Sequence, residues 1–187
     1  DVLLMMDSVT RFAMAQREIG LSTGEPPVSR GYPPSVFALL PQLMERAGNS
    51  KKGSITAFFT VLVDGDDLND PIADQSRSIL DGHIVLTRDL TEQGFYPPIN
   101  ILKSASRVID KVVTKEHYND FLKLKRVLSL IKENEVLIRV GAYKKGMDLE
   151  LDSAIAKKEK AREFLTQGTL EKYSFDEIVA NLRKVLI

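Results

Sequence analysis

The amino-terminal end of the chain is five consecutive apolar residues, Val2 to Met6, followed at once by Asp7. An apolar run without alternation is typical of a strand that is buried on both faces of a parallel sheet. Ser8 is placed to cap a helix, and apolar residues then recur at helical spacing. In open α/β sheets, ligands bind just outside the carboxyl ends of the strands. The pattern therefore predicts a buried strand that presents Asp7 at a ligand-binding edge.

An apolar strand, an Asp and a helix resemble the second nucleotide motif of P-loop NTPases, Walker B, whose Asp helps to hold Mg²⁺. The alternative is a carboxylate that only caps the helix, since any strand-to-helix turn can carry one. The companion phosphate loop, G-x-x-x-x-G-K-[ST], does not occur in the 187 residues. The first residue is also not Met, and a core strand begins almost immediately. We therefore expect the chain to be the carboxyl-terminal part of a longer protein.

The first 110 residues alternate between strand and helix patterns. Apolar runs rich in β-branched and aromatic residues predict further strands at 54–63, 83–87 and 99–102. Helical spacing predicts helices at 8–19, stopped by Gly20, at 35–47, capped by Ser35 and kinked by Pro41, at 72–80, and a short one ending near Gln93. This order predicts a layered α/β sheet with crossover connections.

The composition changes after residue 110. All eight prolines lie before residue 99, and helical periodicity continues from there to the carboxyl terminus. It predicts helices at 115–133, 135–142, 149–165 and 175–186. We therefore expect an α/β domain at 1–110, followed by a small all-helical domain at 111–187.

The charge balance limits the classes of partner. The chain has 26 Lys and Arg and 26 Asp and Glu residues, so bulk basicity gives no reason to expect nucleic-acid binding. The charged run at 157–162 fits a solvated helix face better than a nucleic-acid patch. His83 and His117 stand alone, and the absence of Cys removes thiolate metal sites. No apolar run reaches the roughly 18 residues of a membrane span, and no signal peptide is visible.

Three further features are candidates for function. Arg107 follows the last predicted strand and would ordinarily be a structural ion-pairing residue. Tyr96, fixed by two following prolines, is able to stack on a base, although core packing is the default for an aromatic residue. The acidic segment at 64–71 lacks the spacing of a calcium loop, so a turn or a protein-contact surface is the better interpretation.

Taken together, these motifs resemble those of the ATPases of type III secretion and flagellar protein export, which are similar to the catalytic subunits of rotary ATP synthases. The ordered match covers residues 1 to about 110, and the remainder matches more loosely through Gly141–Gly146. The matching segments are Asp7–Gly20, Glu25–Pro27, Gly31–Phe37, Glu45–Gly48, Gly53–Ala57, Gly65–Ala73, Ser78–Leu86, Tyr96–Asn100 and Ser106–Val108.

The resemblance implies a fold and a set of site residues. It implies part of a RecA-like P-loop NTPase sheet with flanking helices, followed by the helical domain. Asp7 would coordinate Mg²⁺, with Arg11 supporting the same site one helical turn further on. Tyr96 would stack on the adenine of ATP, and Arg107 would be an arginine finger that reaches the γ-phosphate in a neighbouring subunit.

The resemblance also implies partners and a physiological role. Asp66, Asp67, Asn69 and Asp70 match the segment that touches the coiled-coil central stalk in rotary enzymes, within a homo-hexameric ring. The full-length protein would couple ATP hydrolysis to the export of secretion substrates at the cytoplasmic face of the export apparatus. Because the phosphate loop and a catalytic Glu lie upstream in this family, the 187 residues alone are expected to be inactive.

Three alternatives to a flagellar export ATPase share much of this pattern. A virulence type III secretion ATPase would have the same chemistry, and the sequence hardly separates the two systems. A non-catalytic rotary-ATPase subunit would bind nucleotide and offer only its arginine. A ring-shaped RNA helicase of the transcription-terminator type shares the Asp-Ser-x-Thr-Arg pattern, but the zero net charge and the acidic segment count against it.

Overall fold

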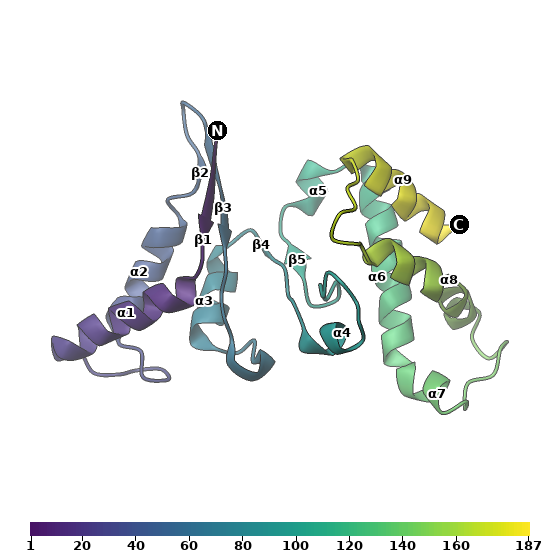
Figure 1. Ribbon diagram of the computed structural model, residues 1–187, viewed down its shortest axis with the longest axis horizontal. Helices are drawn as coiled ribbons and strands as arrows, with labels where there is room; N and C mark the ends of the chain where they lie inside the picture. Colours follow the sequence, from purple (N-terminus) through teal and green to yellow (C-terminus); the bar gives the residue numbers. More distant parts are fainter. The chain divides into compact units, whose positions relative to one another are not determined.

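The computed structural model describes all 187 residues. They divide into two compact units, Asp1–Asp81 and Gly82–Ile187. Each unit has hydrophobic cores of its own. Figure 1 labels the helices and strands of both units.

The first unit combines a small sheet with three helices. Strand β1 (Val2–Met6) runs parallel to β3 (Ser54–Phe59), pairing Val2 with Ile55 and Met6 with Phe59. The short β2 (Gly48–Asn49) pairs antiparallel with β3, which gives the order β1-β3-β2. The remaining elements are α1 (Val9–Ser22), α2 (Pro34–Met44), the 3₁₀ turn η1 (Asp64–Asp66) and α3 (Pro71–Ile79).

The core of this unit lies among the three helices and the carboxyl ends of the two parallel strands. Val9, Val36, Leu40 and Ile72 are fully buried there, and Met6 packs against them. The predicted strand is present, but its faces are not covered within this unit. Residues 2–5 of β1 are 41–75% exposed, because β1 has one neighbouring strand and the helices cover only its end.

Two predicted helix ends in the first unit need correction. Helix α1 continues past Gly20 to Ser22, and Gly20 instead allows a close approach, since a Cβ there would lie 2.7 Å from the Pro33 side chain. Helix α2 begins at Pro34, so Ser35 is not its cap. The backbone N–H of Ser35 donates to the Glu25 carboxylate at 3.0 Å, which satisfies a free amide of the first turn from a distant loop.

The second unit begins with short strands and ends in helices. Strand β4 (Gly82–His83) pairs antiparallel with β5 (Ala105–Ser106) in a separate two-stranded sheet. Its helices are α4 (Arg88–Glu92), α5 (Ile109–Val112), α6 (Lys115–Glu133), α7 (Glu135–Arg139), α8 (Leu149–Leu165) and α9 (Phe175–Leu186).

The strands predicted at 83–87 and 99–102 are mostly irregular backbone. Between them only Leu86 and Ile99 form an isolated antiparallel bridge. Proline lacks the N–H that a strand ladder needs, and Pro97 and Pro98 directly precede the second predicted strand. The prediction of regular strands at 83–87 and 99–102 is therefore wrong.

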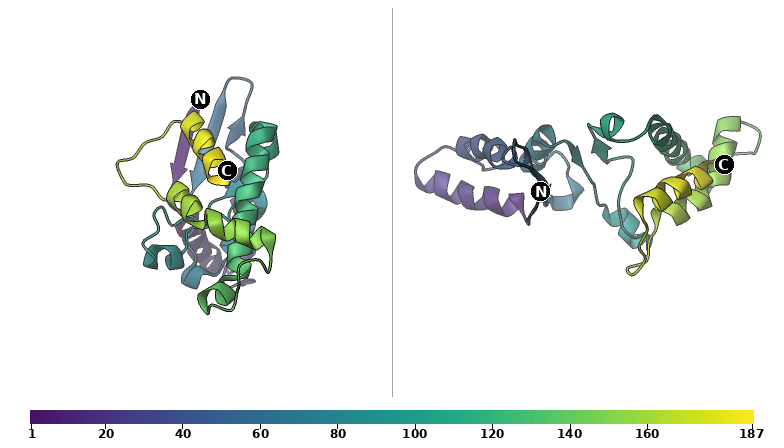
Figure 2. Two further views of the ribbon diagram at one scale, coloured as in Figure 1. Left: turned by 90° about the vertical axis from the view of Figure 1, so that its right-hand side faces the viewer. Right: turned by 90° about the horizontal axis from the view of Figure 1, so that it is seen from above.

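Helices α6, α8 and α9 have the predicted bounds. Each is capped by a side chain that accepts from backbone N–H groups of the first turn, namely Thr114, Asp148 and Ser174. Leu124, Ala161, Leu182 and Val185 form a core that joins the three helices, which the two views of Figure 2 show packed together. None of the helices is both long and apolar enough to cross a lipid bilayer.

Candidate functional site

The structure places Asp7 at the carboxyl end of β1, directly beside the end of β3. The Thr60 hydroxyl donates to Asp7 Oδ1 at 2.6 Å, and the Thr60 N–H donates to the Met6 carbonyl at 3.1 Å. The Asp7 side chain is otherwise exposed, and the peptide bond between Asp7 and Ser8 is cis. The carboxylate is thus fixed at one oxygen at the edge where parallel strands present ligand-binding residues.

Helix α1 starts immediately after this carboxylate. Ser8 is its N-cap, as predicted, and its hydroxyl accepts from the Arg11 backbone N–H at 3.3 Å. The Arg11 side chain is exposed one turn beyond Asp7. Arg11 is therefore accessible at the amino-terminal end of α1, the end that follows Asp7.

The side chains near Asp7 fit a magnesium ion that takes only one ligand from the protein. The structure contains no group of three or more His, Cys, Asp or Glu side chains that could hold a metal ion by themselves. Mg²⁺, however, typically keeps several waters and binds through one or two carboxylates and the phosphate oxygens of its substrate. A single exposed carboxylate with one oxygen fixed by a hydroxyl fits this mode.

Tyr96 lies in the second unit, in the turn that follows α4, and is 52% exposed. Its peptide bond to Pro97 is cis. The Tyr96 carbonyl oxygen accepts a hydrogen bond of 2.8 Å from the Gln167 N–H, in the segment between α8 and α9. The tyrosine turn and the helical part of the chain are therefore joined at this point.

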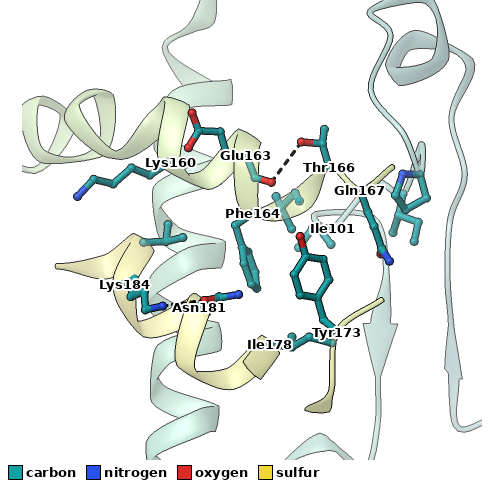
Figure 3. Close-up of a pocket in the computed structure, with 14 residues that line it drawn as sticks. Ile101, Lys160, Glu163, Phe164, Thr166, Gln167, Tyr173, Ile178, Asn181 and Lys184 are labelled. Carbon is teal, nitrogen blue, oxygen red and sulfur yellow. Dashed lines mark hydrogen bonds between the residues drawn. The ribbon is translucent and has the colours of Figure 1, made fainter. Parts of the chain in front are cut away.

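A pocket of about 510 Å³ adjoins this hydrogen bond (Figure 3). Pro97 and Ile101 line it from the turn, and Phe164, Tyr173 and Ile178 line it from the helical part. The Phe164 and Tyr173 rings project into the same space in Figure 3. An apolar cavity with aromatic walls and a few polar groups is suited to a planar ring such as a base.

Polar side chains also line this pocket. The Lys184 ammonium donates to the Asn181 side-chain oxygen at 3.1 Å, and the Thr166 hydroxyl donates to the Glu163 carbonyl at 3.2 Å (Figure 3). The Gln167 side-chain amide donates to the Glu171 carbonyl at 2.6 Å, and the Glu171 carboxylate accepts from the Gly168 N–H at 2.9 Å. These two bonds close the Gln167–Glu171 turn that holds the tyrosine turn.

Arg107 directly follows β5 and precedes α5. Its side chain is exposed on the second unit. Gly82 packs closely against β5 here, since a Cβ would lie 2.7 Å from the Ala105 carbonyl oxygen. The backbone that carries Arg107 is therefore anchored.

The acidic segment at 64–71 is ordered by its own ion pairs and caps. Asp67 pairs with Arg30, and one Asp70 oxygen accepts from the N–H groups of Ile72 and Ala73 at the start of α3. Asp66 and Asn69 have exposed side chains. Of the four residues predicted to face a stalk, two therefore also hold the fold of the segment.

The electrostatics of this segment follow from the Arg30 contact. The hydrogen bond from Arg30 lowers the pKa of the Asp67 carboxyl, and the Asn69 N–H that donates to the same carboxylate lowers it further. The same bond raises the pKa of the Arg30 guanidinium above its usual value. Both groups are charged at neutral pH, so the pair is an ion pair under physiological conditions.

Most of the sequence matches two known protein families. Residues 1–106 match the ATP synthase alpha/beta family, nucleotide-binding domain. The chain belongs to the ATP synthase alpha/beta family. Residues 113–184 match the T3SS EscN ATPase C-terminal domain. These two matches confirm the resemblance to the type III export ATPases and the order of a nucleotide-binding domain followed by a helical domain.

Individual relatives of this family member agree with that assignment. The flagellum-specific ATP synthase of Helicobacter pylori is 60% identical over 187 residues, which are 100% of this chain and 43% of that protein. The assembled ATPase EscN of enteropathogenic Escherichia coli superposes with a TM-score of 0.97 at 51% identity, covering 100% of this chain and 45% of EscN. EscN in complex with its central stalk EscO gives 0.89 at 49% identity, covering 100% and 44%.

The chain therefore spans less than half of the length of these relatives. The sequence predicts Asp7, Arg11, Tyr96 and Arg107 as site residues, but it gives no prediction for Thr60, Phe164 or Gln167, which contact or adjoin them in the structure. Thr60 carries a weak signal, since it lies within the strand predicted at 54–63. The contact of Gln167 with Tyr96 joins residues 71 positions apart, and no sequence motif indicated it.

Proposed function

We propose that the chain forms the magnesium, adenine and arginine-finger part of a flagellar protein export ATPase. The observation that carries the proposal is the exposed Asp7 carboxylate, fixed by Thr60 at the carboxyl end of β1 in a member of the ATP synthase alpha/beta family. The full-length protein hydrolyses ATP and couples hydrolysis to the export of secretion substrates. A flagellar rather than a virulence system is favoured by 60% identity to a flagellar relative, against 51% to EscN.

Asp7 would hold Mg²⁺ in this proposal, and the bound ion would supply positive charge beside the phosphates of ATP. The Thr60 hydroxyl occupies Oδ1 and so leaves Oδ2 of the carboxylate for the cation or its water. Arg11 supports the same site from the first turns of α1. In phosphoryl transfer the protein mainly positions groups and stabilises charge, and these residues do both.

The base of ATP is bound by Tyr96 in this proposal. The half-exposed ring lies in a turn that the Gln167 N–H fixes, and the neighbouring pocket offers Phe164 as a further apolar contact. An aromatic face binds a base by stacking, which depends little on hydrogen-bonding groups.

The boundary between the nucleotide-binding and helical domains lies near residue 110 in this proposal, and the change of composition there supports it.

Arg107 acts in trans as an arginine finger, within a homo-hexameric ring. Its exposure and its anchored backbone, directly after β5, support this role. A planar guanidinium pairs with two phosphate oxygens at once and so stabilises charge that develops in the transition state.

The acidic segment faces a coiled-coil central stalk protein at the axis of the ring. The complex of EscN with its central stalk EscO supports a partner of this kind. Asp66 and Asn69 supply exposed contacts, while Asp67 and Asp70 also keep the segment in shape. The protein works in the cytoplasm, at the inner-membrane export apparatus, without binding nucleic acid.

The test is Mg²⁺-dependent ATP hydrolysis by the full-length protein. Asp7→Asn removes the charge that holds the cation, so turnover should fall by at least about a hundredfold. Asp81→Asn, which changes an exposed carboxylate in the same unit, is the matched control and should keep its turnover. Full turnover in Asp7→Asn, or stimulation of the wild-type enzyme by RNA, would contradict the proposal.

A further inference from the structure

The hydroxyl of Thr10, in the first turn of α1, binds both backbone groups of one residue. It accepts from the Leu62 N–H at 2.8 Å and donates to the Leu62 carbonyl at 3.2 Å. Strand β3 ends at Phe59, so Leu62 lies beyond the part of the chain that β1 pairs with. The Thr10 hydroxyl therefore satisfies the backbone N–H and C=O of Leu62, as a neighbouring strand would, beyond the last residue pair of β1 and β3.

Thr60 makes a second set of bonds between the same two segments. Its carbonyl accepts from the Val9 N–H at 3.0 Å, in addition to its bonds with Met6 and with the Asp7 carboxylate. The turn from Met6 to Thr10 and the segment from Thr60 to Leu62 are thus joined at several points. Movement of one segment has to carry the other with it, because each bond tolerates only a small displacement.

The acidic segment begins directly after this junction. Only Val63 separates Leu62 from η1, which starts at Asp64. Further along, the segment is fixed by the Arg30–Asp67 pair and by a bond of 2.7 Å from Arg77 to the Leu68 carbonyl. Because these contacts make the acidic segment rigid, we expect a displacement of Leu62 to move the whole segment.

We propose that Thr10 is a positioning residue that transmits the state of the Asp7 site to the acidic segment. The inference deepens the function proposed above and rests on it, since it assumes that Asp7 responds to Mg²⁺ and nucleotide. Oδ1, which accepts from the Thr60 hydroxyl, belongs to the same carboxylate as Oδ2, so a cation on Oδ2 would draw negative charge away from Oδ1 and weaken the Thr60 bond. The resulting adjustment of the turn reaches the acidic segment through the Thr10–Leu62 bonds.

Thr10 also has a simpler role, which is to fix the start of α1. A role limited to stability would make every variant equally responsive to nucleotide once it is folded. A positioning role changes the response itself. The experiment therefore has to compare the acidic segment with and without nucleotide, in proteins that all bind it.

The experiment is amide hydrogen exchange of the full-length protein, with Mg²⁺ and the non-hydrolysable analogue AMPPNP as the probe. The peptide covering residues 61–70 is measured with and without the probe, and binding of the probe is measured separately. Thr10→Val removes the hydroxyl at nearly constant size, and Thr10→Ser keeps it. Thr23→Val is the matched control, because the Thr23 hydroxyl donates to the Gly20 carbonyl at 2.9 Å at the other end of α1.

In the wild-type protein, Mg·AMPPNP should change exchange in residues 61–70. In Thr10→Val, which removes both hydrogen bonds to Leu62, the basal exchange there should rise at least about fivefold, the worth of one net hydrogen bond, and the change caused by the probe should be largely lost. Thr10→Ser and Thr23→Val should respond as the wild type does. Binding of the probe should stay within a few-fold of wild type in all of them.

Two outcomes would overturn the inference while leaving the proposed function intact. One is a wild-type protein that binds the probe without any change in residues 61–70. The other is a Thr10→Val protein whose response matches that of Thr23→Val. Failure of the wild-type protein to bind Mg·AMPPNP at all would instead contradict the proposed function, and the inference with it.

Discussion

Arg30 Nη2 lies 2.6 Å from Asp67 Oδ2, which joins the loop before α2 to the acidic segment. Arg30 Nη1 also lies 3.6 Å from Asp70 Oδ2. Arg30 holds a positive φ of 42°, a backbone conformation that is uncommon for residues other than glycine. The acidic surface proposed to face a stalk is therefore shaped by an arginine 37 positions earlier in the chain.

Removing this arginine should loosen the acidic segment without unfolding the unit. In Arg30→Ala, amide exchange of residues 64–70 should rise several-fold, since Asp67 loses its bonded cation while the rest of the core stays intact. Arg46→Ala, which changes an exposed arginine of the same unit, should leave exchange unchanged. The prediction fails when both variants give the same exchange rates. Hydrogen exchange followed by mass spectrometry measures this directly.

The Arg30–Asp67 pair should also make the acidic segment sensitive to acid. The pKa of Asp67 is lowered in the folded chain, so the pair adds stability at pH values above the ordinary carboxyl pKa of about 4. That contribution is lost as the pH falls through the lower, folded-state pKa. Exchange in residues 64–70 should therefore rise, after correction for intrinsic rates, as the pH falls from about 6 to about 3. Arg30→Ala should remove most of this added dependence, and an unchanged profile would count against the pair.

The Tyr96 ring should contribute to nucleotide affinity through its face and not its hydroxyl. Tyr96→Ala in the full-length protein should weaken binding of Mg·ADP about 10- to 100-fold, the range expected from one stacked base. Tyr96→Phe keeps the ring and should bind nearly as well as the wild type. Titration with a fluorescent nucleotide, displaced by ADP, measures both. Equal losses in the two variants would show that the hydroxyl matters and that stacking is the wrong description.

Two leucines of α8 should contribute very differently to the free energy of unfolding, because one is buried and the other is exposed. Leu151 is 2% exposed and packs with Leu130 and Ala154, whereas Leu149 is 82% exposed. Leu151→Ala should lower the free energy of unfolding by about 2–5 kcal/mol, because it leaves a cavity. Leu149→Ala should change the free energy of unfolding by no more than about 0.5 kcal/mol. Urea denaturation followed by circular dichroism tests both, and comparable losses would mean that the core of the helical part is misassigned.

The sequence predicted the helical part well, because its signals are local. Helices α6, α8 and α9 each combine an N-cap residue with an apolar face at helical spacing, and both signals act within a few residues. The strand β1 and the cap at Ser8 were predicted for the same reason. Local sequence signals were sufficient to place these elements.

The errors arose where distant residues decide the local structure. Ser35 looked like a helix cap, but Glu25 supplies the carboxylate that accepts from its N–H. Residues 83–87 are apolar enough for a strand, yet their partner segment pairs through only a few residues. Thr10, Thr60 and Gln167 belong to the candidate site through contacts that exist only in the folded chain. Such contacts leave no pattern in a single sequence.

In the proposed hexamer, Asp7 of one subunit and Arg107 of its neighbour complete a single ATPase site. Each of the full-length variants Asp7→Asn and Arg107→Ala should be nearly inactive alone, since an arginine finger contributes roughly 10³–10⁵ in turnover. Arg107→Lys should be almost as impaired as Arg107→Ala, because a point charge does not reproduce the planar fork of the guanidinium.

The most direct measurement is ATP turnover in mixtures of Asp7→Asn and Arg107→Ala subunits that exchange freely. At equal amounts, about a quarter of the interfaces in a ring would pair an intact Asp7 with an intact Arg107. Turnover should then rise well above that of either variant alone. As a control, a double variant with both changes should not restore turnover when it is mixed with Asp7→Asn subunits, because no subunit in that mixture has an intact Asp7. Mixtures that remain inactive at every ratio, although mixed rings are shown to form, would contradict a site shared between subunits.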